Sequence, residues 1–131
     1  RTLLIKGKNL RKKKELYKVV LKANKKAIMS VKSGVKAKQV DLKAKEIIKK
    51  AGYEKFFGHA TGHGVGLDIH EFPHISFHSK DVLQEGMVFT IEPGIYIPEI
   101  GGVRIEDMIY IDNNEKPIVL TNLPKELEII G

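Results

Sequence analysis

The hydrophobic pattern changes its period at Gly52, and this change constrains the fold more than any other feature of the sequence. Before Gly52, apolar residues recur every three or four positions, which is the spacing of amphipathic helices. After Gly52, short apolar runs alternate with polar residues and are separated by Gly and Pro, as in strands joined by turns. The sequence therefore predicts an α+β domain, in which two amphipathic helices pack on a mainly antiparallel sheet.

The helical part of the sequence is also strongly basic. We predict one helix at about residues 9–31 and a second at about residues 37–51, with Gly52 at the C-terminus of the second. Residues 1–50 carry 18 Lys and Arg against 3 Asp and Glu, whereas residues 51–131 carry 5 against 13. A basic arm of this kind can bind nucleic acid. We expect no nucleic-acid partner, because the lysines fit the solvent sides of the helices and lack the aromatic residues that stack on bases.

The second half of the sequence predicts strands at residues 87–92, 103–111 and 118–121. Alternation puts Arg104 and Glu106 on the same face of the second of these strands. Antiparallel pairing of the first two strands would place Glu92 opposite Glu106.

The segment GHATGHGVGLDIHE, residues 58–71, holds three histidines among glycines and allows several kinds of site. Residues 70–74, HEFPH, have the letters of the zinc motif H-E-x-x-H, but Pro73 would break the helix that this motif requires. Residues 62–66, GHGVG, resemble a phosphate-binding loop, but Leu67 stands where the third glycine is needed. We therefore reject both motifs.

A metal site built on strands is the interpretation that we favour. Glutamate oxygens can bridge two divalent ions and an imidazole can complete part of the shell, so the candidate donors are His63, Glu92 and Glu106. Pairs of metal ions ~3.5–4 Å apart activate a water for hydrolysis. Each residue also has a structural interpretation: Glu92 as a solvent-facing strand residue, Glu106 as an ion-pair partner of Arg104, and His63 as a turn residue.

Three segments resemble the signatures of the pita-bread metallopeptidases, namely TGHGVGLDIHE, LQEGMVFTIEPGIYIP and GGVRIEDMIYI. This family comprises methionine aminopeptidase, aminopeptidase P, prolidase and creatinase. The resemblance extends over residues 10–130, and the EPGIY and GVRIED forms favour the aminopeptidase P and prolidase branch. It implies part of a pita-bread fold and hydrolysis of the bond before proline at peptide N-termini. A methionine aminopeptidase and a non-catalytic pita-bread binding module are the alternatives.

The resemblance also implies a role for particular residues. His63, Glu92 and Glu106 would bind two divalent metal ions, with Mn favoured over Co, Fe or Zn, and Glu106 would bridge the two. Glu92 would also act as the general base, and His70 would stabilise the tetrahedral intermediate. The substrate would be a proline-containing peptide. The residues that contact it would be His59 and Arg104.

The family pattern also contains two aspartate donors from an earlier strand pair, and no aspartate of this sequence stands in that motif. We therefore expect residues 1–131 to be the C-terminal half of a metallopeptidase catalytic domain, inactive alone. We also expect a homo-oligomer or association with the other half. Without Cys, the chain can form no disulfide and no thiolate metal site. No apolar run reaches the ~18 residues of a membrane span, so we expect a cytoplasmic protein.

Overall fold

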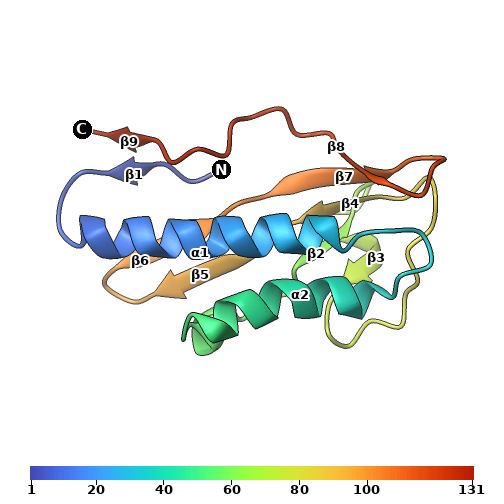
Figure 1. Cartoon of the computed structure of the whole chain (residues 1–131), viewed down its shortest axis with the longest axis horizontal. Coiled ribbons are helices and arrows are strands. Elements are labelled where there is room, and N and C mark those ends of the chain that lie inside the picture. The colour runs from blue at the N-terminus through green and yellow to red at the C-terminus, as the bar shows by residue number, and fades with distance from the viewer.

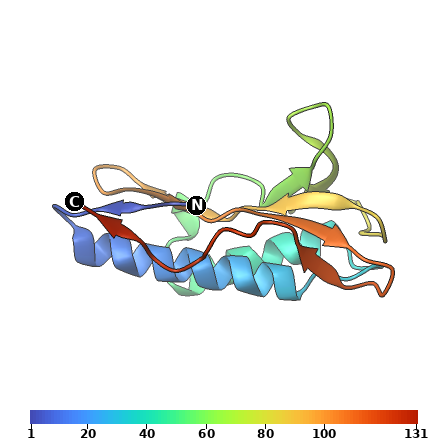
Figure 2. The same cartoon turned by 90° about the horizontal axis from the view of Figure 1, so that it is seen from above.

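Two helices lie side by side on one face of a sheet, which confirms the predicted α+β architecture (Figure 1). The computed structural model describes residues 1–131 and places α1 at Leu10–Met29 and α2 at Ala37–Lys50. Seen from above, both helices lie on the same side of the strands, and the loop that joins β2 (Gly62–Gly64) to β3 (Glu71–Ile75) rises from the other side (Figure 2). Neither helix combines the length and the apolarity that a membrane crossing requires.

The helix ends follow from local hydrogen bonding. The predicted first helix is two residues too long at its C-terminus, where the Ser30 hydroxyl donates to the Ala27 carbonyl at 2.7 Å and ends α1. At the start of α2, the Lys36 backbone N–H donates to the Gln39 side chain at 3.2 Å. At its end, Gly52 adopts a φ of 84° and donates to the Lys49 carbonyl, as predicted for a C-terminal glycine.

The main sheet has five strands in the order β3-β2-β4-β7-β8, and every neighbouring pair is antiparallel. Its strands are β2 (Gly62–Gly64), β3 (Glu71–Ile75), β4 (Val88–Ile91), β7 (Asp107–Ile111) and β8 (Pro117–Val119). Two smaller sheets pair β5 (Gly94–Ile97) with β6 (Gly101–Arg104), and β1 (Leu4–Ile5) with β9 (Ile129–Ile130). A short 3₁₀ turn, η1, spans Glu54–Phe56. The parallel β1–β9 pair brings the first and last strands of the chain side by side (Figure 1).

The predicted strand at residues 103–111 is wrong in one respect, because it is two strands, β6 and β7, separated by Ile105 and Glu106. The partner strand is interrupted at the same level, after Ile91. Pro93 has no backbone N–H to donate, so the ladder cannot continue through it. The last strand is also shorter than predicted, since β8 ends at Val119. β2 and β3 were not predicted as strands.

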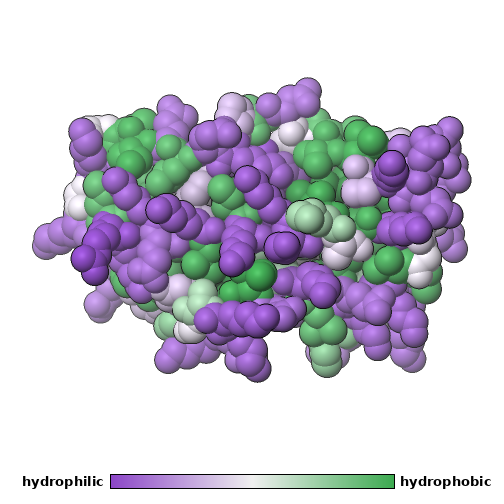
Figure 3. All heavy atoms as spheres, viewed as in Figure 1, coloured by the Kyte–Doolittle hydropathy of each residue, from purple (hydrophilic) through white to green (hydrophobic).

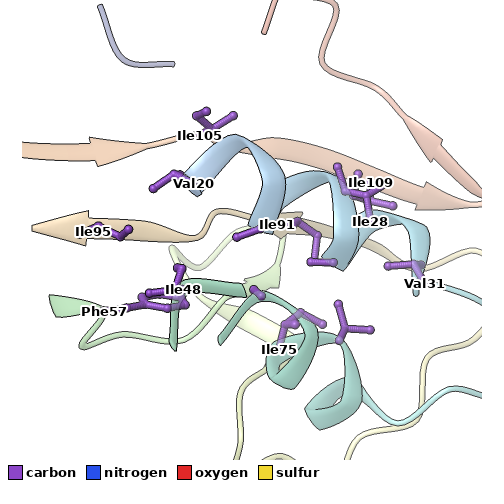
Figure 4. Packing of buried hydrophobic residues seen from close by; sticks show 14 of the residues in the cluster. Val20, Ile28, Val31, Ile48, Phe57, Ile75, Ile91, Ile95, Ile105 and Ile109 are labelled. Carbon is purple, nitrogen blue, oxygen red and sulfur yellow. The ribbon is translucent and has the colours of Figure 1, made fainter. Parts of the chain in front are cut away.

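The core lies between the helices and the sheet and contains 22 buried residues. Ile28 from α1, Ile48 from α2, and Ile91 and Ile109 from the sheet all point into this layer (Figure 4). The opposite side of α1 is mostly hydrophilic (Figure 3). Its exposed residues include Lys18, Lys22, Lys25 and Lys26, which supports our interpretation of the lysines as the solvent sides of the helices.

Candidate active site

One polar pocket collects most of the residues that the sequence singles out. It has a volume of about 400 Å³ and holds four of the five histidines of the chain. Only one lining residue is hydrophobic, so the pocket suits charged or hydrogen-bonding ligands rather than apolar ones. The lining residues are His59, Ala60, Gly62, His63, His70, His74, Ser76, Glu92 and Arg104.

His63 and Glu92 form the shortest contact between two side chains that line this pocket. The His63 Nε2 atom lies 3.0 Å from Glu92 Oε1, and both side chains are mostly buried. The other ring nitrogen, Nδ1, lies 2.9 Å from the Gly64 carbonyl oxygen, which can only accept, so Nδ1 carries a hydrogen. A neutral His63 then turns a lone pair toward the carboxylate, and two acceptors stay together only with a cation or a proton between them. An imidazole nitrogen and a carboxylate oxygen are also donors that divalent metals accept, so the pair fits part of a metal shell.

Thr90 links the Glu92 carboxylate to the backbone of His63. Its hydroxyl donates to Glu92 Oε1 at 2.9 Å and accepts from the His63 backbone N–H at 3.1 Å. Thr90 and Glu92 alternate along the strand with Phe89 and Ile91, which are fully buried in the core. The alternation therefore directs the Thr90 and Glu92 side chains to the face that the helices do not cover.

Arg104 and His59 line a second side of the pocket, and both contact Tyr96. The Arg104 Nε–H donates to the Tyr96 hydroxyl at 2.7 Å, and His59 Nε2 lies 3.0 Å from the same hydroxyl. This hydrogen bond raises the pKa of Arg104, as do the nearby charges of Glu92 and Glu106, although partial burial opposes them. Arg104 Nη1 lies 3.8 Å from Glu92 Oε2, so a fixed positive charge faces the carboxylate.

His70 also lies in the pocket, at the end of the loop between β2 and β3. Its ring meets the His63 ring edge-on, with 4.5 Å between the ring centroids. The adjoining strand β3 contains Pro73, so residues 70–74 are extended rather than helical and cannot form the H-E-x-x-H zinc motif.

Glu106 is the one predicted site residue that does not line the pocket. The register pairs Ile91 with Asp107 on one side of the break and Gly94 with Arg104 on the other. Continuing it puts Glu106 opposite Glu92, as predicted, but both lie outside the paired residues. No three His, Asp or Glu side chains of the chain gather closely enough to hold a metal ion. The structure thus brings His63 and Glu92 together without a third donor.

Four residues of the site were missed by sequence reasoning, namely Thr90, Tyr96, His74 and Ser76. Thr90 could have been found, because strand alternation places it on the same face as Glu92. His74 and Ser76 enter the pocket only because β3 pairs with β2, and the sequence did not predict either strand.

A protein-family model and several known proteins match this chain over most of its length. The model of metallopeptidase family M24 matches residues 1–113. The Xaa-Pro dipeptidase of Pyrococcus horikoshii is 54% identical over 114 residues, which are 87% of this chain and 32% of that protein. The chain therefore spans about a third of the length of this relative.

Two solved structures resemble the fold closely. An Xaa-Pro dipeptidase from Bacillus anthracis superposes with a TM-score of 0.92 at 46% identity, covering 99% of this chain and 36% of that one. A prolidase from Thermococcus sibiricus gives 0.93 at 45% identity, covering 99% and 35%. Because the family model matches most of its length, this chain belongs to metallopeptidase family M24.

Proposed function

We propose that this chain forms part of the catalytic site of an Xaa-Pro peptidase, which hydrolyses the bond before proline at the N-terminus of a peptide. The observation that carries the proposal is the His63–Glu92 pair, 3.0 Å apart in a pocket that Arg104 and three other histidines also line. The likeness to Xaa-Pro dipeptidases supports the choice of substrate class.

His63, Glu92 and Glu106 would be the metal donors from this chain, with Glu106 opposite Glu92 in the strand register although it does not line the pocket. Two divalent ions, with Mn favoured over Co, Fe or Zn, would supply the positive charge that activates a water molecule and polarises the scissile carbonyl. Because no three possible donors gather within these 131 residues, we infer that the shell is completed by protein outside them. The two aspartates of the family pattern are the candidates.

The residues of the pocket also have roles in proton transfer, in stabilising the oxyanion and in binding the substrate. Glu92, held by the Thr90 hydroxyl, takes the proton from the attacking water as general base. His70 faces the same space beside His63 and donates to the carbonyl oxygen as negative charge develops on it. Arg104 and His59, joined through the Tyr96 hydroxyl, bind the substrate.

Exposed apolar side chains beside the pocket support the need for a covering partner. Leu67 and Ile69, in the loop between β2 and β3, and Phe72 in β3 are largely exposed. Apolar groups gathered in this way usually mark a contact surface. We infer that further protein covers them in the active assembly, either from the same polypeptide or from a second copy.

The test is the Glu106→Gln variant of the native protein, assayed on Xaa-Pro dipeptides, with a Met-initiated peptide as a second substrate. An amide cannot supply two anionic oxygens to two cations, so turnover should be lost while the circular dichroism spectrum stays unchanged. Glu85→Gln, on an exposed turn residue, is the matched control and should keep full activity. Retained turnover of Glu106→Gln with two metals bound would contradict the assignment, and preference for the Met-initiated peptide would contradict the substrate class.

Metal binding by the 131-residue chain is a second test. We expect at most one weak Mn²⁺ site by calorimetry, since the chain lacks a group of three donors. Tight binding of two Mn²⁺ ions to a chain that sedimentation shows to be monomeric would refute the inference that other protein completes the shell.

A further inference from the structure

Asp41 is a fully buried carboxylate on α2 that does not line the pocket. Its Oδ1 atom accepts two hydrogen bonds from Thr61, at 2.8 Å from the hydroxyl and 3.2 Å from the backbone N–H. Its Oδ2 atom has no well-directed hydrogen bond and lies 2.8 Å from the Lys45 ammonium group, as an ion pair. Burying a carboxylate costs free energy, and an apolar side chain would fill the same space without that cost. A buried aspartate bonded to Thr61 therefore needs an explanation beyond packing.

Thr61 connects this carboxylate to both halves of the His63–Glu92 pair. It lies directly before β2, which carries His63. Its carbonyl accepts a hydrogen bond of 2.7 Å from the Glu92 backbone N–H, and its own N–H also donates to the Ile75 carbonyl at 2.9 Å. A shift of Thr61 would therefore move the backbone at His63 and at Glu92 together.

Close packing around Gly62 leaves β2 little room to move relative to β4. A Cβ atom at Gly62 would lie 1.8 Å from the Thr90 carbonyl oxygen, so β2 approaches β4 more closely than any side chain permits. Thr90 is also the residue whose hydroxyl bonds the His63 backbone and the Glu92 carboxylate. Asp41 thus acts through Thr61 on the Glu92 backbone, and Thr90 bonds the His63 backbone and the Glu92 carboxylate, so these contacts together hold both residues of the pair.

We propose that Asp41 is a positioning residue, which through Thr61 sets the separation and direction of His63 and Glu92 for metal binding. It contacts neither metal nor substrate. The proposal rests on the metal site of the proposed function and extends it by one residue that lies on a helix outside the pocket.

The test compares Asp41→Ala with Asp41→Asn in the native protein. The asparagine keeps an oxygen that can accept from Thr61, whereas the alanine does not. Loss of a residue that orients a metal ligand typically lowers metal affinity or activity by about 10–100-fold, so Asp41→Ala should bind Mn²⁺ that much more weakly. Asp41→Asn should restore most of this affinity. The loss of activity should appear in kcat rather than in KM, because Arg104 and His59, which we propose to bind the substrate, are hydrogen-bonded to Tyr96 and not to Asp41.

Ile48→Val is the matched control, since Ile48 is fully buried on the same helix and no hydrogen bond links its side chain to Thr61. It should leave the Mn²⁺ affinity unchanged. Thr61→Val against Thr61→Ser provides a second pair of variants if Asp41→Ala fails to fold, with the serine expected to retain affinity and the valine to lose it.

Two outcomes would overturn the proposal. One is wild-type Mn²⁺ affinity in a folded Asp41→Ala or Thr61→Val variant, and the other is an equal loss in Ile48→Val. The His63 ring resonance in the metal-free protein separates this proposal from the proposed function. It should shift in Asp41→Ala and not in Ile48→Val, even if the wild-type protein proves to bind no Mn²⁺.

Discussion

Asp41 and Asp107 are both fully buried, but their partners differ in kind. Asp107, in β7, is paired with two cations, Arg1 at 2.8 Å and Lys125 at 2.6 Å, and accepts from the Asn24 amide at 3.0 Å. Asp41 has one cation, on its own helix, and two hydrogen bonds from Thr61. We infer that Asp107 mainly stabilises the fold and that Asp41 mainly orients Thr61.

The segments joined by Asp107 are far apart in the sequence. Arg1 and Lys125 come from near the two ends of the chain, and Asn24 comes from α1. The Arg1 guanidinium also donates to the Glu106 carbonyl, so the same cluster holds the backbone of a proposed metal donor. Burial by itself raises the pKa of Asp107, but hydrogen bonds from Lys125, Arg1 and Asn24 outweigh it and lower the pKa below its ordinary value.

The largest effect is expected from Asp107→Ala. Removing the carboxylate leaves two mostly buried cations without their partner, and breaking such a buried pair typically costs about 3–5 kcal/mol of unfolding free energy. Urea unfolding followed by circular dichroism measures the change. A loss below about 1 kcal/mol would mean that water or other groups compensate for the cations, and that the two aspartates do not differ as we infer.

Acid should remove part of the same stability. The folded pKa of Asp107 lies below its ordinary value of 3.8, so the unfolded chain takes up its proton first as the pH falls. The stabilisation from Asp107 is therefore complete above about pH 4 and is lost between that pH and the lower folded pKa. Unfolding free energies measured from pH 5 downward should fall more steeply for the wild type than for Asp107→Asn. Parallel curves would exclude a lowered pKa for this carboxyl group.

A smaller effect is expected from Lys45→Met, which leaves Asp41 Oδ2 without its cation. Lys45 is 34% exposed, so water can partly replace its ammonium group, and we expect a loss of about 1 kcal/mol. The methionine keeps apolar contact with Phe57, over whose ring the lysine lies. If urea unfolding shows a loss as large as that of Asp107→Ala, Asp41 depends on charge pairing as much as Asp107 does.

The smallest effect is expected from Glu46→Ala on the solvent side of α2. Glu46 pairs with Lys50 one turn away, and both side chains are exposed, so solvent screens the interaction. The urea midpoint should not change within experimental error. A clear shift would mean that exposed pairs also contribute to stability, and the contrast with the buried aspartates would need revision.

The sequence alone determines the parts of this protein that depend on local periodicity. Helical spacing predicted α1 and α2 to within two residues at every end, and alternation of apolar and polar residues predicted strands that include β4 and β7. The same alternation predicted that Glu92 and Glu106 would be opposite each other. These features repeat every two to four residues, so neighbouring residues carry enough information to define them.

The connections between segments follow only from the tertiary structure. Asp41 meets Thr61, and Arg1 meets Asp107, through contacts between residues that are 20 and 106 positions apart. The interruption between β6 and β7 likewise lies opposite Pro93, which falls between β4 and β5. No local pattern records such contacts, because they arise when separate elements pack together and bring their polar groups into hydrogen-bonding distance.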